Sequence, residues 1–156
     1  MINIITLLKN AINKVITLDA DLMDAESLKT FFSAKNYPVT YEMGSGWTMN
    51  SCNVYAFGSI MRISMNITRS SATGAGAIEN ETVATLTIEH GGQIGSATGN
   101  TAINMSGGPI ASFHTDSISV NETTMSVRIR LNNTHSAATA FNTSICMPIC
   151  ARASAY

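Results

Sequence analysis

The chain has 156 residues, of which 45% are hydrophobic and 12% are charged, and its formal net charge is −1. This length favours one globular domain with its own core, and the low charge argues against a disordered chain and against electrostatic binding to nucleic acid or anionic lipid. Ser, Thr and Asn together supply 49 of the residues. The polar character therefore comes from uncharged side chains, as in many β-rich subunits of assemblies.

The first residues do not follow the order of a secretory signal. The apolar stretch 1–8 is interrupted by Asn3 and Thr6, and Lys9 comes after it, whereas a signal has its positive charge first and then an unbroken apolar core. The sequence also lacks any run of about 18 apolar residues, the length that a membrane-spanning helix needs. We therefore expect a soluble protein that is made in a cytosol.

The N-terminal residues have the spacing of an amphipathic helix. Apolar residues recur at alternating steps of four and three, as in the a/d seam of a coiled coil; they are Met1, Ile5, Leu8, Ile12 and Val15. A second short helix is predicted over residues 24–32, with Asp24 and Glu26 at its positive N-terminal end. Two heptads are compatible with two arrangements: a stalk that gathers several chains through Ile5, Leu8, Ile12 and Val15, or a helix packed on its own domain.

The distribution of charge predicts a boundary near Ser33. Residues 1–32 hold seven charged side chains, and the remaining 124 residues hold twelve. We therefore predict a helical, oligomerisation segment over residues 1–33 and a second domain over residues 34–156.

From Val39 onward the hydrophobic pattern has a period of two, which indicates half-buried strands. Pro148 is expected to place the last strand at a sheet edge. Clusters of Gly, Ser and Asn separate the strands, so the sequence predicts a mainly β protein, an antiparallel, jelly-roll-like β-sandwich preceded by a short α-helical segment. The predicted strands are Val39–Met43, Trp47–Phe57, Ile60–Thr68, Ala84–Glu89, Thr101–Ser106, Ile110–Thr115, Ser117–Val120, Met125–Leu131 and Phe141–Ile149.

Few residues have the spacing of a catalytic site. His90, His114 and His135 lie in separate contexts, where we expect surface or loop positions rather than shared metal coordination. Glu79 and Glu81 share a strand face, but no partner acid is evident. The motifs of serine hydrolases, phosphate-binding loops and zinc proteases are missing. The sequence predicts a protein without enzymatic activity, cofactor or metal.

The three cysteines, Cys52, Cys146 and Cys150, are too few for a disulfide framework and are interpreted as reduced, buried thiols. Cys146 and Cys150 would share a face of a helix, but on a strand they lie about 13 Å apart and cannot bind one ion. The apolar residues around them favour the strand, which argues against zinc.

Five residues are candidates for ligand binding. Trp47, the one tryptophan, has two interpretations: it stacks on a sugar, or it fills the core or a subunit interface. Tyr55 follows it in the same predicted strand. Arg62, Arg128 and Arg130 alternate with apolar residues and are interpreted as an outward polar patch, for a ligand or interface, or as solvated surface.

The region from residue 47 to residue 151 resembles the tip domains of bacteriophage tail fibres and baseplate receptor-binding proteins. The resemblance lies in the Gly46-Trp47 opening, the turn 55–58 into the strand 60–68, and the segments 83–88 and 126–133. It implies a β-sandwich that follows a helical segment and assembles as a homotrimer. It assigns no binding residue.

We therefore expect a non-enzymatic structural protein of a phage virion, a tail-fibre or baseplate tip that binds a glycan or protein on the host surface. The N-terminal helix would contact other virion proteins, without nucleic acid or membrane insertion. Two alternatives remain open: a capsid-decorating or head-fibre protein, and a monomeric carbohydrate-binding or adhesion module. Low charge and small polar side chains suit subunits that bury surface against one another.

Overall fold

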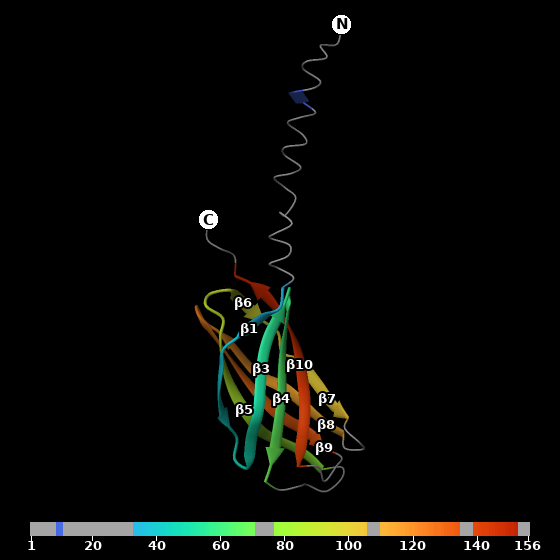
Figure 1. The fold of residues 1–156 in the computed structure, drawn as a ribbon. Helices are drawn as coiled ribbons and strands as arrows, with labels where there is room; N and C mark the ends of the chain where they lie inside the picture. The colour runs from blue at the N-terminus through green and yellow to red at the C-terminus, as the bar shows by residue number, and fades with distance from the viewer. Residues whose placement is uncertain (1–8, 11–32, 71–76, 106–109, 135–138, 153–156) are drawn as a thin grey trace. The chain divides into compact units, whose positions relative to one another are not determined.

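The computed structural model describes residues 9–10, 33–70, 77–105, 110–134 and 139–152 (Figure 1). The chain divides into two units, Met1–Ser33 and Ala34–Tyr156. Apart from Lys9, Asn10 and Ser33, the first unit lies outside the described residues. The helices predicted there therefore stay a prediction, as do the seam residues Ile5, Leu8, Ile12 and Val15.

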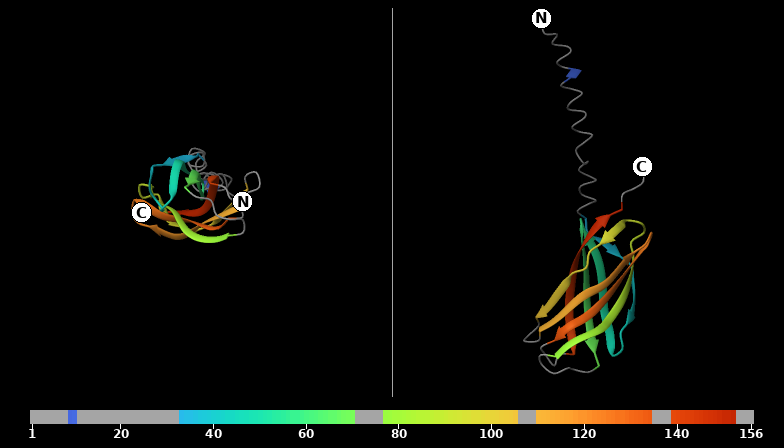
Figure 2. Two further views of the ribbon diagram at one scale, coloured as in Figure 1. Left: turned by 90° about the horizontal axis from the view of Figure 1, so that it is seen from below. Right: turned by 180° about the vertical axis from the view of Figure 1, so that it is seen from behind.

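The described residues of the second unit form two antiparallel five-stranded sheets, which we call sheet I and sheet II. Seen along the strands, the sheets form two layers (Figure 2). Sheet I has the order β1 (Lys35–Tyr37), β3 (Trp47–Phe57), β4 (Ile60–Arg69), β10 (Ala140–Ala151) and β6 (Ile94–Ala97). Sheet II has the order β2 (Val39–Met43), β5 (Ala77–Glu89), β9 (Thr124–Thr134), β8 (Ile110–Val120) and β7 (Thr101–Met105).

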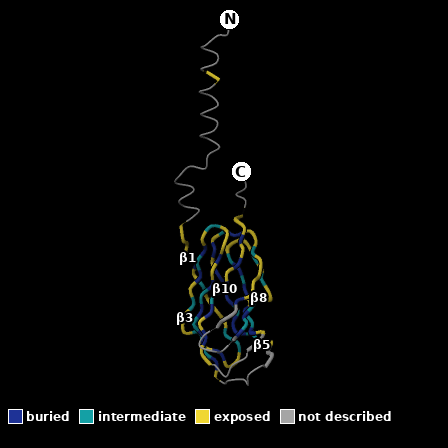
Figure 3. Tube along the Cα trace, turned by 90° about the vertical axis from the view of Figure 1, so that its right-hand side faces the viewer, coloured by how far each residue is buried: buried dark blue, intermediate teal, exposed yellow. Residues whose placement is uncertain are grey.

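The mainly β, two-sheet prediction is confirmed for the described residues, and the period-two pattern is the reason. In β4, Met61, Ile63, Met65 and Ile67 are buried, and the residues that alternate with them, Arg62, Ser64 and Asn66, are exposed or half-buried. The same alternation runs along β9 and β10, and the buried residues of both sheets form one core cluster. Figure 3 colours the chain by burial. Burying one such side chain contributes roughly 1.5–3 kcal/mol, so this shared core holds the two layers together.

Some details of the strand prediction are wrong. The short strands β1 and β6 were not expected, and the two strands predicted over 110–115 and 117–120 are one strand, β8, with an irregularity between Thr115 and Ser117. An extra residue at such a bulge disturbs the alternation on which the prediction depended.

The edge position predicted for the last strand is also wrong, because β10 pairs with β4 on one side and with β6 on the other. Pro148 is tolerated at the junction of these two ladders. Its carbonyl accepts a hydrogen bond from the Thr98 N–H on the β6 side, and a residue's nitrogen and carbonyl point to the same side of a strand. The nitrogen of Pro148 therefore points to the β6 side, one residue before the pairing with β6 starts at Ile149. The missing N–H of proline thus removes no hydrogen bond from that pairing.

Candidate ligand-binding face

The outward side chains of β3, β4 and β10 form rows across sheet I. The register aligns Ser51 with Asn66 and Asn53 with Ser64, and β10 continues both rows. Because side chains in register stand on the same face of a sheet, the rows make one continuous surface. We call this surface the amide–hydroxyl face: Ser51, Asn53, Ser64, Asn66, Asn142 and Ser144.

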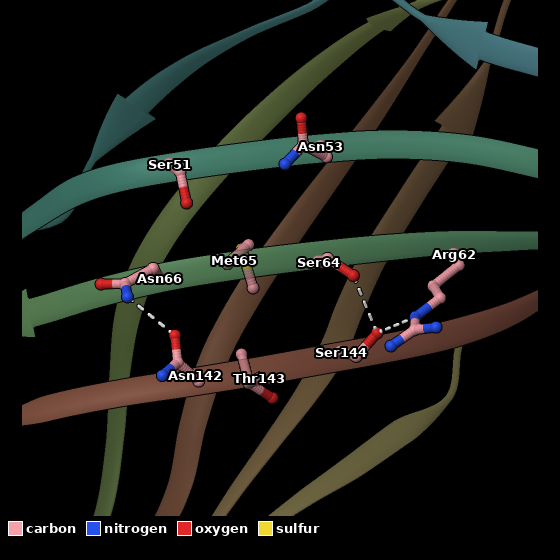
Figure 4. Close-up of a pocket in the computed structure, with 9 residues that line it drawn as sticks. All are labelled: Ser51, Asn53, Arg62, Ser64, Met65, Asn66, Asn142, Thr143 and Ser144. Atoms are coloured by element: carbon pink, nitrogen blue, oxygen red, sulfur yellow. Dashed lines mark hydrogen bonds between the residues drawn. The ribbon is translucent and has the colours of Figure 1, made fainter.

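Asparagine side chains cross this face as a chain of hydrogen bonds. The Asn50 Nδ2 donates to the Asn66 Oδ1 at 2.7 Å. The Asn66 Nδ2 donates in turn to the Asn142 Oδ1 at 2.7 Å, the bond drawn between these two residues in Figure 4. These contacts orient the amide of Asn66. Asn142 takes part through its oxygen, so its NH₂ group stays available to a ligand.

A second network lies one row further along the strands. The Arg62 Nε donates to the Ser144 Oγ, and the hydroxyls of Ser144 and Ser64 are 3.1 Å apart (Figure 4). The Arg62 guanidinium carbon lies 5.8 Å from the centre of the Tyr55 ring, within the range of a cation–π contact. Polar and aromatic groups are thus adjacent on one face.

The amide–hydroxyl face is hollowed into a shallow, open depression of about 330 Å³. Among the described side chains, Ser51 and Asn53 line it without a side-chain hydrogen bond of their own. Hydroxyl and amide groups both donate and accept, as sugar hydroxyls do, so the depression offers matched partners for a neutral polar ligand.

The structure separates the five candidate ligand residues. Tyr55 and Arg62 lie together beside the amide–hydroxyl face, with Arg62 opposite Tyr55 in the register of β3 and β4. Arg128 and Arg130 lie on β9 of sheet II, on the outer face of the other layer. The predicted patch that combined all three arginines is therefore wrong.

Arg128 and Arg130 are engaged in ion pairs with Asp116. The Arg128 Nε and the Arg130 Nη1 lie 2.7 and 2.9 Å from the two carboxylate oxygens of Asp116. Burial raises the pKa of Asp116, but the hydrogen bonds from the two guanidinium groups outweigh this effect and hold the pKa below its ordinary value. The same contact raises the pKa of Arg128. Both guanidinium groups are thus engaged by Asp116, although the buried Arg130 Nε has no hydrogen-bond partner.

Trp47 belongs to the core, so its assignment as a ligand platform is corrected. Its side chain is 6% exposed, and its ring lies 6.3 Å from Phe113 and 5.9 Å from Phe141, centre to centre. Its Nε1–H donates to the Glu81 carboxylate at 3.0 Å, and Glu81 also pairs with Arg69 at 3.1 Å. This contact joins sheet I to sheet II, and Arg69 lies over the indole at 5.2 Å.

The remaining polar candidates do not form a site in the part of the chain that the structure describes. His90 lies in a loop, as expected, but it is buried, and its Nδ1 accepts a hydrogen bond from the Ile94 N–H at 3.3 Å. His114 is half-buried on β8, and His135 lies outside the described residues. No cluster of three His, Cys, Asp or Glu side chains that could hold a metal occurs among the described residues.

Cys146 and Cys150 lie on a strand, as predicted, but both are exposed, so the expectation of buried thiols is wrong for them. They occupy the outer face of β10, where side chains alternate with the core positions. Cys52 is half-buried, and burial raises the pKa of its thiol to about 11. No described helix has the length and apolar character needed to cross a membrane.

Sequence reasoning missed the polar residues of the amide–hydroxyl face and the buried Arg69. A signal for the first was present, because Ser64 and Asn66 alternate with buried residues of β4, and Asn142 and Ser144 do so in β10. The alternation does not say which strands are neighbours, so the face was visible only once the register was known.

No protein-family model, curated protein or solved structure matches this chain.

Proposed function

We propose that this protein is a non-enzymatic attachment protein that binds a cell-surface glycan through the amide–hydroxyl face of sheet I. The observation that carries the proposal is the polarity of that face: over β3, β4 and β10, Arg62 is the one charged side chain that points outward. A surface of hydroxyl and amide groups matches the many donors and acceptors of a sugar. Tyr55 beside it supplies an aromatic surface for the apolar face of a sugar ring.

The proposal places the protein at the tip of a phage tail fibre or baseplate, in the virion, as a homotrimer. A jelly-roll-like sandwich after the helical segment that the sequence predicts for residues 1–33 would suit that role. A shallow depression gives weak binding at each site, and repetition of the site across a trimer and across a particle raises the overall avidity. The low charge of the chain, 12%, supports a subunit that lies against its own copies.

Blocking the depression tests the binding site. We replace Asn53, exposed on the amide–hydroxyl face, with tryptophan, and use the replacement of Thr87, exposed on the outer face of sheet II, as the matched control. Fluorescently labelled protein is incubated with a panel of bacterial cells and with their purified surface polysaccharides. N53W should abolish adsorption that T87W retains. Equal adsorption by both variants would place binding elsewhere.

Light scattering coupled to size exclusion tests the assembly. A trimer has three times the mass of the 16.6 kDa chain. A stable monomer would contradict the fibre-tip role and favour a single carbohydrate-binding module. In that case the adsorption experiment still decides whether the amide–hydroxyl face binds glycan.

A further inference from the structure

Arg62 stands apart from the other outward arginines of the two sheets. Arg128 and Arg130 share the carboxylate of Asp116. Arg62 pairs with no carboxylate in the described part of the chain, where its side chain contacts the hydroxyl of Ser144 and the ring of Tyr55. It is therefore a positive charge without a compensating negative charge, in a surface that is otherwise neutral.

The guanidinium of Arg62 is held in place from one edge. Its Nε donates to the Ser144 Oγ, and Ser144 is in turn 3.1 Å from the hydroxyl of Ser64 (Figure 4). Within the described residues, its two terminal nitrogens make no hydrogen bond. Because the fork of an arginine is planar, fixing one edge pre-orients the terminal nitrogens for a second planar group.

The position of Arg62 also fits a ligand that extends across the depression. Arg62 and Asn53 both line the hollow of about 330 Å³, together with Ser64 and Ser144. Along the strands, the row of Tyr55 and Arg62 is next to the row of Asn53 and Ser64. A charged group on Arg62 and sugar hydroxyls on Asn53 are thus neighbouring contacts for one monosaccharide unit.

We propose that the glycan bound by this face carries a carboxylate, as a uronic acid does, and that Arg62 binds this carboxylate with its two terminal nitrogens. This inference rests on the proposed function and adds the charge of the ligand. Planar carboxylates match the planar guanidinium fork through two parallel hydrogen bonds. Tyr55 supports the guanidinium from its ring face, which narrows the orientations that Arg62 adopts.

The test compares acidic sugars with their neutral counterparts. The probes are glucuronate and glucose, galacturonate and galactose, mannuronate and mannose, and glycerol phosphate as an anion of different shape. Binding to the full-length protein is measured by chemical-shift changes of ¹⁵N-labelled protein during titration. The variants are R62Q and R62K, with R128Q on sheet II as the control.

At least one uronate should bind roughly tenfold more tightly than its neutral counterpart, since hydrogen bonds to charged groups are the stronger ones. R62Q should remove this preference, R62K should retain only part of it because the planar fork is lost, and R128Q should leave it unchanged. The preference should also weaken at 1 M NaCl, because Arg62 is exposed.

Three patterns of binding would overturn the inference, and so would the absence of any binding. One is equal affinity of wild-type protein for acidic and neutral sugars, which leaves glycan binding itself intact. Another is tighter binding of glycerol phosphate than of every uronate, which makes the anion a phosphate. The last is a uronate preference that survives R62Q. If no probe binds, the carboxylate site is rejected, and the adsorption of N53W and T87W to cells separately decides the proposed function.

Discussion

The polar side chains on the outer faces of the two sheets find their partners in different ways. On sheet I, uncharged amides and hydroxyls bond to one another across β3, β4 and β10, as Asn66 does with Asn142. On sheet II, the charges of Arg128 and Arg130 are paired with Asp116 within the chain. Groups that are paired internally have little left to offer a partner, whereas Ser51 and Asn53 on sheet I retain their hydrogen-bonding capacity. The more highly charged face is therefore the less available one.

The largest effect on both faces is expected from a cavity in the core that lies between the two sheets. Phe113 is fully buried, and its ring lies 5.4 Å from that of Phe141. Phe113→Ala should lower the free energy of unfolding by about 3–5 kcal/mol, because the cavity forms between the layers. Urea unfolding measures this loss. The exposed control T87A should change stability by less than about 0.5 kcal/mol, and a similar loss in both variants would contradict a shared core.

The next largest loss of stability is expected when the contact of Glu81 with Trp47 and Arg69, which links the two sheets, is weakened. Glu81→Gln removes the charge that pairs with Arg69 and weakens the acceptor of the Trp47 Nε1–H. Since Arg69 is 9% exposed, we expect a loss of about 1–3 kcal/mol in unfolding free energy. Glu89→Gln, an exposed position on the same strand, is the control and should be nearly neutral. Indistinguishable melting temperatures for the two variants would show that the link contributes nothing.

The amide chain of sheet I should contribute less. Asn66→Ala deletes the bonds to Asn50 and Asn142, and the expected loss is about 1 kcal/mol, since each exposed hydrogen bond competes with water. No charge is involved, so 1 M NaCl should leave the difference unchanged. Urea titrations at low and high salt check this. A loss that disappears at high salt would reveal an electrostatic origin and weaken the contrast between the faces.

On sheet II, in contrast, the contribution of the Asp116 ion pairs to stability should depend on salt and on pH. Asp116→Asn removes both ion pairs, and because the cluster is partly exposed we expect a loss below about 1 kcal/mol. The pKa of Asp116 is lowered in the folded protein. Its contribution is therefore complete above the ordinary pKa of about 3.9 and is lost as the pH falls below that value through the folded pKa. Wild type and D116N should thus differ at pH 6 and converge in strong acid, as thermal unfolding across pH would show.

The smallest perturbation is chemical modification of cysteines, which distinguishes the outer face of sheet I from the face that packs against the core. Cys146 and Cys150 are exposed, whereas Cys52 is half-buried with its thiol pKa raised to about 11 by burial. At pH 8 a thiol-reactive reagent should label Cys146 and Cys150 at least roughly tenfold faster than it labels Cys52. Mass spectrometry of quenched samples identifies them. Labelling of Cys52 at the same rate as the others would contradict the burial of its sulfur.

The sequence predicted the strands best where alternation was long and regular. The strand 47–57 was predicted with its final bounds, and the buried positions of β4, such as Ile63, are those that the period of two indicates. Alternation failed where the chain departs from it. At the irregularity between Thr115 and Ser117 one strand appeared to be two, and β1 and β6, of three and four residues, are too short to show a period.

The candidate site was predicted only in part. Tyr55 and Arg62 were named from the sequence and lie together, because they alternate outward on neighbouring strands joined by one tight turn. Asn142 joins them from 80 residues away in β10, opposite Asn66, and no local pattern announces such a pairing. Trp47 was named as a ligand candidate with a core position as its other interpretation, because its type suits both, and only packing against Phe113 and Phe141 decides for the core.

The sequence alone was enough to predict that this protein is mainly β, which side chains are buried in regularly alternating strands such as β4 and β9, and that its polar surface is largely uncharged. These properties follow from the pleat of a strand and from composition, which are local. The neighbours of each strand, by contrast, came only from the tertiary structure, and with them the gathering of Ser and Asn side chains on sheet I and the pairing of Asp116 with two arginines on sheet II. The reason is physical: pairing partners are chosen by the joint burial of residues far apart in the chain, and one residue of shift in register would move every side chain of a strand to the opposite face.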